Sequence, residues 1–299
     1  MSYFTPSSKH PSVSGLFDLQ GTHYARIASN AMFLYDHLIT VNDEVELIWK
    51  AKWSFVTILF LMNRYYVLAA VFFNLYVFFS PNITDTICTR YSHWEAWSGL
   101  VVFMPAHGIL QIRIYALYSL NKKILALMLV FYITSSSVSA WILRTDLESL
   151  VVAALPILGG KFCVPTKISS FSSFWIPVLL FDFMLFSLAV IRGVGEYRSK
   201  GSSIFRGSRS LMNILIRDSV FYFLVIAITY LTCLQFWLSA PLLVEAPLGF
   251  APAMSSVLAS RVLFNIRRAS REESSTLSQT IQFKTAELGA ENPQGEERD

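Results

Sequence analysis

Long apolar runs separated by short polar stretches account for most of the chain. A helix that crosses the hydrocarbon core of a bilayer needs about 20 mainly apolar residues. Six runs meet this requirement clearly, at residues 55–79, 97–119, 123–143, 172–191, 214–238 and 247–265. A seventh run, at 24–41, is a weaker candidate because it contains Asn30, Asp36 and His37. Since the runs are continuous rather than alternating, the pattern predicts membrane-crossing helices and not a β-barrel.

Composition supports this prediction. Of the 299 residues, 54% are hydrophobic and 15% are charged. A soluble domain carries about 25% charged residues, because its surface faces water. The shortfall in charge excludes a soluble globular enzyme, a disordered chain and a nucleic-acid-binding protein. We therefore expect an all-α integral membrane bundle of seven transmembrane helices, with the lipid bilayer as its main partner.

The distribution of basic residues predicts the orientation of the bundle. Lys and Arg are enriched in the cytoplasmic loops of membrane proteins, and one set of loops holds about twice as many as the opposite set. This bias places the N-terminus outside and the C-terminus in the cytoplasm. The expected organisation is an extracellular N-terminal tail at 1–23, a seven-helix membrane domain at 24–265 and a disordered cytoplasmic tail at 266–299. The tail is expected to be disordered because it is polar and charged with few aromatic residues.

Two features of the predicted outer loops agree with this orientation. Asn82 begins an Asn-Ile-Thr sequon, a candidate for glycosylation, which takes place on the lumenal side. Cys88 and Cys163 fall in two loops that both lie outside, where disulfides persist. These two cysteines can form a bridge or remain free thiols, and the sequence does not decide between the two. Cys233 lies within the sixth span and is expected to be a small core residue.

Several ionisable residues fall inside the predicted spans. Such groups are energetically costly in lipid, so they are candidates for function by default. The candidates are Asp36, His37, Arg64, His107, Arg113, Asp182, Arg217, Asp218 and Arg261. For most of them the simpler interpretation is a set of structural ion pairs, with Arg217 and Arg261 near enough to the surface to snorkel. Asp182 and Arg64 lie deeper and are better candidates for a buried pair or a switch. A lone His107 is typical of a side chain hydrogen-bonded to a neighbouring helix.

The last span begins with residues that disfavour helices. Residues 241–254, PLLVEAPLGFAPAM, contain three prolines, one glycine and Glu245. Such residues are tolerated where the freed backbone lines a cavity or is covered by protein. A kinked last helix beside an outer vestibule, with Glu245 at its mouth, is one interpretation. An ordinary loop that ends near Pro247 is the other.

Two cytoplasmic segments could contact a signalling partner. The loop at 192–213 is the most basic in the chain, which positive-inside topology alone explains, although contact with anionic lipid is an alternative. The C-terminal tail contains Arg267-Arg268-Ala269-Ser270, which has the form of a site for a basic-directed kinase. Ser270 is therefore a phosphorylation candidate.

The sequence gives no sign of catalysis. It lacks an HExxH zinc motif, a GxSxG nucleophile motif, a phosphate-binding loop and paired Cys or His with metal-ligand spacing. A retinal Schiff base would need a lysine in the last span, which has none. We therefore expect no catalytic residues, no metal site and no cofactor.

One segment resembles a known family. The residues that carry the resemblance are Tyr35-Asp36-His37-Leu38-Ile39-Thr40, Asp43-Glu44-Val45-Glu46-Leu47-Ile48-Trp49, Lys52-Trp53-Ser54, Leu59-Phe60-Leu61 and Asn63-Arg64-Tyr65. Across about residues 34–66 they are similar to the signature of a large group of seven-pass membrane proteins of mushroom-forming fungi, defined through an N-terminal domain of unknown function. Shorter later pieces also resemble the group, around Arg113, Arg217-Asp218 and Arg261. The resemblance implies an integral membrane protein without an established activity, ligand or cofactor.

The leading functional hypothesis is a receptor-like protein of the plasma membrane. The seven-span layout resembles the architecture of G-protein-coupled receptors by analogy only, and architecture does not imply function. The chain lacks the E/DRY and NPxxY motifs of those receptors. The alternatives are a transporter or channel for a small solute, with Asp182 and Arg64 on its path, and a membrane scaffold or enzyme. The ligand is not identified by the sequence.

Overall fold

The computed structural model describes residues 13–78, 80, 83–157, 160–167, 172–199, 208–239 and 245–290. Within these ranges the chain is mainly helical. The helices and strands are α1 (Val13–Ile39), α2 (Val41–Glu44), the π-helical turn η1 (Val45–Trp49), α3 (Phe55–Leu61), the π-helical turn η2 (Met62–Tyr66), α4 (Val67–Phe78), α5 (Asp85–Leu117), α6 (Lys122–Ser149), β1 (Val151–Ile157), β2 (Gly160–Lys167), α7 (Ser172–Ser199), α8 (Ser208–Ser239) and α9 (Glu245–Ala290).

Several of these helices have the length and apolarity needed to cross a bilayer. Among the described residues, five segments qualify by length and composition, and a shorter apolar helix lies at Phe221–Phe236. The five are Phe55–Val77, Asp85–Leu117, Lys122–Ser149, Ser173–Gly195 and Pro247–Glu272. They coincide with five of the six clear predicted spans. The chain therefore has the helices of a multi-pass membrane protein.

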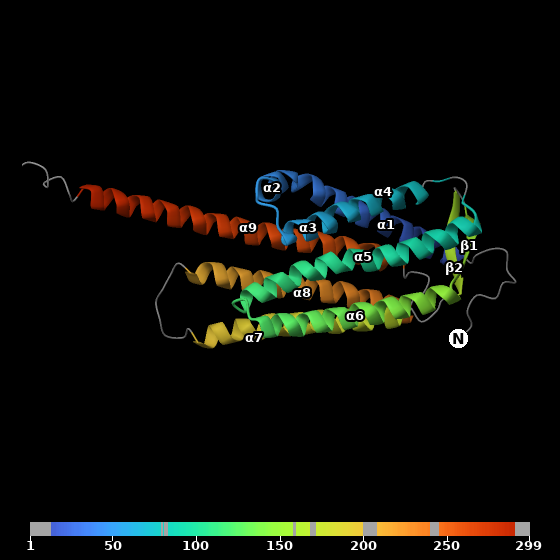
Figure 1. The fold of residues 1–299 in the computed structure, drawn as a ribbon. Coiled ribbons are helices and arrows are strands. Elements are labelled where there is room, and N and C mark those ends of the chain that lie inside the picture. The colour runs from blue at the N-terminus through green and yellow to red at the C-terminus, as the bar shows by residue number, and fades with distance from the viewer. Residues whose placement is uncertain are drawn as a thin grey trace, which may run out of the picture.

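The long helices lie side by side in one bundle (Figure 1). The β1–β2 hairpin lies at one end, called the hairpin end, and α2 lies at the opposite end, called the α2 end. Helix α1 packs along α9, and α7 packs on both α6 and α8. Helix α5 is the most buried of the five segments, whereas α6 exposes apolar side chains such as Val130, Ile133 and Trp141. Since lipid rather than water suits such an exposed apolar face, the pattern is typical of a membrane bundle.

Local sequence signals explain where several helices begin. The hydroxyls of Ser54 and Thr84 accept hydrogen bonds from the backbone N–H three residues on, at the starts of α3 and α5. Asn121 caps α6 by accepting from the N–H of Lys123 at 2.9 Å. Side chains of this kind satisfy donors that the first helical turn leaves unpaired. Between α5 and α6 the chain reverses through Ser119 and Leu120, both with positive φ.

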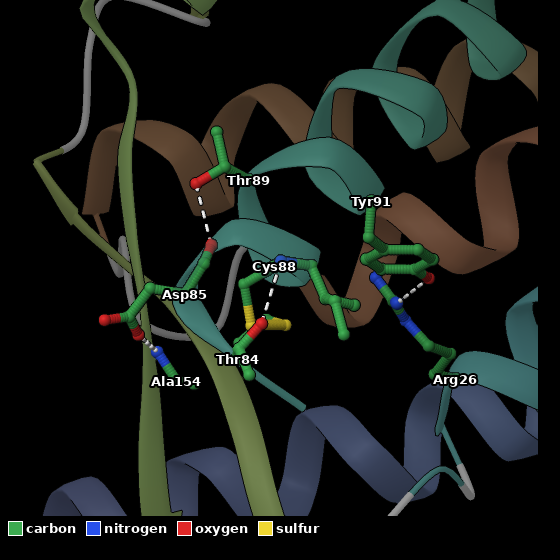
Figure 2. The surroundings of a disulfide bond; sticks show 9 residues. Arg26, Thr84, Asp85, Cys88, Thr89, Tyr91 and Ala154 are labelled. Carbon is green, nitrogen blue, oxygen red and sulfur yellow. Dashed lines mark hydrogen bonds between the residues drawn. A yellow bond between two sulfur atoms is a disulfide. The ribbon is translucent and has the colours of Figure 1, made fainter. Parts of the chain in front are cut away.

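A disulfide fixes the hairpin to the bundle. Cys88 near the start of α5 is bonded to Cys163 of β2, 75 residues later in the chain. Figure 2 shows this region, where the N–H of Ala154 in β1 donates to Asp85 at 2.7 Å. Of the two states left open by the sequence, the structure therefore contains the bridge. The antiparallel hairpin itself was not predicted.

The two ends of the chain differ from expectation. Helix α1 begins at Val13, eleven residues before the predicted span at 24, so part of the segment expected to be a tail is helical. At the other end, α9 continues to Ala290, so the predicted disorder is wrong for residues 266–290. Arginines in this part of α9 bind the N-terminal half of the chain, and the tertiary contacts stabilise a helix that composition alone does not. Residues 291–299 lie outside the described ranges.

Candidate functional site

A buried ion pair lies at the centre of the N-terminal segment. Nε of Arg64 lies 2.6 Å from a carboxylate oxygen of Glu44, and both side chains are 2% exposed. The guanidinium also donates to the carbonyl of His37 at 2.9 Å and to the hydroxyl of Thr40 at 2.8 Å. Two aromatic rings face it, those of Phe60 and Phe264. The charge of Arg64 is therefore paired with that of Glu44 away from solvent.

The carboxylate of Glu44 is equally well satisfied. Its second oxygen accepts from the indole N–H of Trp49 at 3.0 Å and from the hydroxyl of Tyr65 at 2.7 Å. A buried ion pair offsets its desolvation cost only when further hydrogen bonds satisfy its polar atoms, and here both Glu44 and Arg64 have such bonds. Sequence reasoning missed Glu44, because residues 42–52 are a charged stretch between the predicted spans at 24–41 and 55–79 and were expected to form a cytoplasmic loop.

The two π-helical turns position this pair. Glu44 directly precedes η1, and Arg64 lies within η2. A π-helical turn displaces the backbone hydrogen-bonding pattern, and such turns are frequent at functional sites. Next to Arg64, the carbonyl of Asn63 accepts from the hydroxyl of Ser256, while its amide donates to the carbonyl of Ser256 and the hydroxyl of Ser260. Helix α9 thus supplies hydrogen bonds to the amide and the carbonyl of Asn63 in η2.

Four arginines of α9 bind the same N-terminal segment, and we call this set of contacts the α9 clamp. Three form ion pairs, and the fourth binds a backbone carbonyl and a hydroxyl. The contacts are Arg261 with Asp36 at 2.6 Å, Arg268 with Asp43 at 2.9 Å, Arg271 with Glu46 at 3.1 Å, and Arg267 with the carbonyl of Leu47 and the hydroxyl of Thr57, both at 2.8 Å. The clamp joins residues more than 200 positions apart in the chain.

A second buried pair joins α5 to α7. Nε2 of His107 lies 3.3 Å from Asp182, and both residues are buried. The rings of Phe103 and Phe181 flank His107. Arg64 and Asp182, the two deep candidates of the sequence analysis, therefore have different partners.

The other sequence candidates occupy separate positions. Arg113 is buried on α5 with its guanidinium over the ring of Tyr222. Ser270 is exposed on α9. Arg217 and Asp218 belong to α8, but their side chains lie outside the described part of the molecule, as does Asn82. Within the described part, no group of three or more His, Cys, Asp or Glu side chains is placed to hold a metal ion.

A cavity of about 210 Å³ opens at the hairpin end, and we call it the hairpin-end cavity. Its lining is mainly apolar and comes from α1, α4, α5, α6, α7, α9 and β1. Gly249 and Pro252 of α9 lie in its wall, as the interpretation of a helix beside a vestibule expected. Glu245 starts α9, but its side chain lies outside the described part of the molecule.

One polar group of residues lies in the wall of this cavity. Arg26 pairs with Glu95 at 2.7 Å and donates to the hydroxyl of Tyr91 at 2.7 Å. That hydroxyl donates in turn to Asn74 at 3.0 Å. Figure 2 shows Arg26 reaching Tyr91 from α1. Sequence reasoning missed this group, because Glu95 precedes the predicted third span and Arg26 was not among the candidate residues.

Comparison with known proteins bears on the N-terminal segment alone. Residues 24–69 match DUF6533, a family of unknown function. The match confirms the resemblance to a domain of unknown function for this segment, and it contains both Glu44 and Arg64. No curated protein matches the chain.

Proposed function

We propose that this protein is a receptor-like sensor in the plasma membrane. In this proposal seven helices cross the bilayer, the N-terminus lies outside and the C-terminus lies in the cytoplasm. Helices α1 and α8, with 27 and 32 residues, would complete the five qualifying segments. At about 1.5 Å per residue each is long enough to span the hydrocarbon core. The disulfide favours an outer location for the hairpin end, because such bonds persist in oxidising compartments.

The hairpin-end cavity is the observation that carries the proposal. Ligand sites are typically concave, mainly apolar and supplied with a few polar groups that fix orientation, and this cavity has all three properties. Its volume of about 210 Å³ exceeds the engineered cavity of about 150 Å³ that binds benzene. A small, mainly apolar molecule is therefore a suitable ligand by size.

Helix α9 connects the cavity to the opposite end of the bundle. Leu248, Gly249, Pro252 and Ala253 line the cavity, and the arginines of the α9 clamp lie farther along the same helix. Figure 1 shows α9 continuing beyond the α2 end. A ligand that shifts α9 would therefore change the clamp, since a helix moves largely as a unit. This end of α9 and the 192–213 loop are the proposed contacts for a cytoplasmic signalling partner.

The test measures coupling between the two ends. Spin labels are placed at exposed Lys50 and Glu272 in the full chain, with Cys233→Ser as background, and their separation is measured in nanodiscs. Small apolar molecules that stabilise the protein should change the distance distribution. Gly99→Leu fills the cavity, because the space beside Gly99 is open, and should abolish this change. Gly195→Leu, a matched substitution with open space on α7, is the control and should leave the change intact.

Two outcomes would contradict the sensor proposal. Binding that leaves the label distance unchanged would indicate a binding protein without coupling. Solute flux in proteoliposomes that Gly99→Leu blocks would indicate a transporter. Glycosylation at Asn82 in cells tests the orientation separately, because only a lumenal sequon is modified.

A further inference from the structure

We propose that the hairpin-end cavity binds a small apolar molecule that carries a carboxylate, and that this carboxylate replaces that of Glu95 on Arg26. The inference rests on the proposed function, in which the cavity is the ligand site. It adds the chemical class of the ligand and the residue that recognises it.

Arg26 is a fixed cation in the cavity wall. Its side chain is 13% exposed, and one nitrogen donates to the hydroxyl of Tyr91 at 2.7 Å. Asn74 holds that hydroxyl from the other side at 3.0 Å. The guanidinium remains protonated under all physiological conditions and presents paired donors that match a carboxylate. Arg26 is therefore in place before a ligand enters.

Glu95 is the exchangeable partner. Its oxygen lies 2.7 Å from the second terminal nitrogen of Arg26, but the Glu95 side chain is 37% exposed. A carboxylate with that exposure can rotate into water at small cost, whereas moving the more buried Arg26 would also break its bond to Tyr91. An entering carboxylate can thus take the place of Glu95 without leaving the guanidinium unpaired. An amine ligand would require the opposite exchange, with Arg26 released.

The rest of the cavity fits the apolar part of such a molecule. Val67 and Val71 of α4, Val102 and Phe103 of α5, and Ala253 of α9 contribute apolar wall. Burial of apolar ligand surface against these side chains supplies affinity, while the ion pair fixes orientation. A single ring or short chain with one terminal carboxylate matches both properties.

A matched set of three probes tests the proposal. Phenylpropanoate, phenylpropanol and phenylpropylamine share one carbon skeleton and differ in the charge of the terminal group. Their dissociation constants for the full chain in nanodiscs are measured by calorimetry at neutral pH, with empty nanodiscs to correct for partition into lipid. Phenylpropanoate should bind about tenfold more tightly than phenylpropanol, as expected for one added charged hydrogen-bonding group.

Two substitutions should move this preference in opposite directions. Glu95→Gln removes the competing carboxylate and should tighten phenylpropanoate binding by about tenfold, with phenylpropanol unaffected. Arg26→Gln should abolish the preference for the acid. Glu148→Gln, which removes the carboxylate of an exposed pair with Arg144, is the control and should change neither affinity. If Arg26→Gln does not fold, Glu95→Gln still decides the question.

The possible failures can be told apart. Tighter binding of phenylpropylamine than of phenylpropanoate, or no effect of Glu95→Gln, would overturn the carboxylate exchange. If phenylpropanol nevertheless binds and Gly99→Leu prevents this binding, the cavity remains a ligand site, and only the recognition of a carboxylate by Arg26 is contradicted. If none of the three probes binds, both the inference and the use of the cavity as a ligand site are contradicted.

Discussion

Removal of one partner of the buried Glu44–Arg64 pair should destabilise the protein strongly. Arg64→Leu deletes the ion pair and the hydrogen bonds to His37 and Thr40. The carboxylate of Glu44, which is 2% exposed, then loses its charged partner and keeps the hydrogen bonds from Trp49 and Tyr65. Breaking a buried pair from one side costs about 3–5 kcal/mol, because the remaining charge is buried without compensation. We expect a loss of free energy of unfolding in that range.

The double variant separates the burial of an unpaired charge from a loss of packing. Glu44→Leu combined with Arg64→Leu removes both charges, and apolar replacement of a buried pair is often neutral or stabilising. Trp49 and Tyr65 lose their acceptor in this variant, but both are exposed enough to bind water. We therefore expect the double variant to be more stable than Arg64→Leu alone. The interaction energy should be about 2–3 kcal/mol, the upper part of the range for coupled residues.

The chain contains its own reporter for this measurement. Cys233 is a free, fully buried cysteine, whereas Cys88 and Cys163 are bonded to each other. A thiol-reactive dye therefore labels Cys233 only when the bundle opens, and its labelling during denaturant titration reports unfolding. Arg144→Leu, on the exposed pair with Glu148, is the control and should leave the midpoint unchanged. An Arg64→Leu variant as stable as this control would refute the reasoning, as would a double variant that loses the sum of the two single losses.

Three further substitutions test the packing around the two sites by denaturant titration. Cys88→Ser opens a closed loop of 75 residues and should lower stability by about 4 kcal/mol, and reduction of Cys88–Cys163 in the wild type should reproduce the loss. Both of these titrations are followed by tryptophan fluorescence, because the freed thiols would also react with the dye. Gly249→Ala places a Cβ 2.7 Å from the hydroxyl of buried Ser29. Either this hydroxyl must rotate and lose its bond to the carbonyl of Arg26, or α1 and α9 must separate slightly, so we expect a cost of about 1–3 kcal/mol, and unchanged stability would contradict that close approach. Arg267→Gln weakens two charged hydrogen bonds of the α9 clamp and should cost about 2 kcal/mol, whereas a neutral result would show that the clamp does not stabilise the bundle.

Hydrophobic pattern predicted the membrane helices because lipid leaves the backbone few choices. Each polar backbone group in the hydrocarbon must be satisfied within the helix, so a continuous apolar run becomes a continuous helix. The sequence also indicated which two of the three cysteines could form a disulfide, since it placed Cys88 and Cys163 in predicted loops on the same side of the membrane. The pattern did not predict the β1–β2 hairpin, whose strands form through pairing with each other and contact with α5. Such contacts join separate parts of the chain, so they leave no regular spacing of apolar residues in the sequence that would predict them.

Glu44 shows why only one member of the buried pair, Arg64, could be predicted from the sequence. A polar stretch such as residues 42–52 normally faces water, and nothing in its composition marks one of its acids as buried. The turn η1 directs Glu44 toward Arg64, which lies 20 residues later, while neighbouring Glu46 is exposed and pairs with Arg271. The α9 clamp depends on contacts between residues about 225 apart, and a pairing over that distance is invisible in one sequence.

The α9 clamp is graded in strength along the helix, and this gradient decides how α9 can move. Asp36, which pairs with Arg261, is buried, whereas both partners are exposed in the pair of Arg268 and in that of Arg271. Exposed pairs contribute little because water screens them, while a buried carboxylate is costly to leave alone. A displacement of α9 would therefore break the outer two pairs first and keep the pair nearest the bundle. The Glu44–Arg64 pair lies wholly within the segment that matches DUF6533, so a displacement of α9 that breaks the outer two pairs need not break this one.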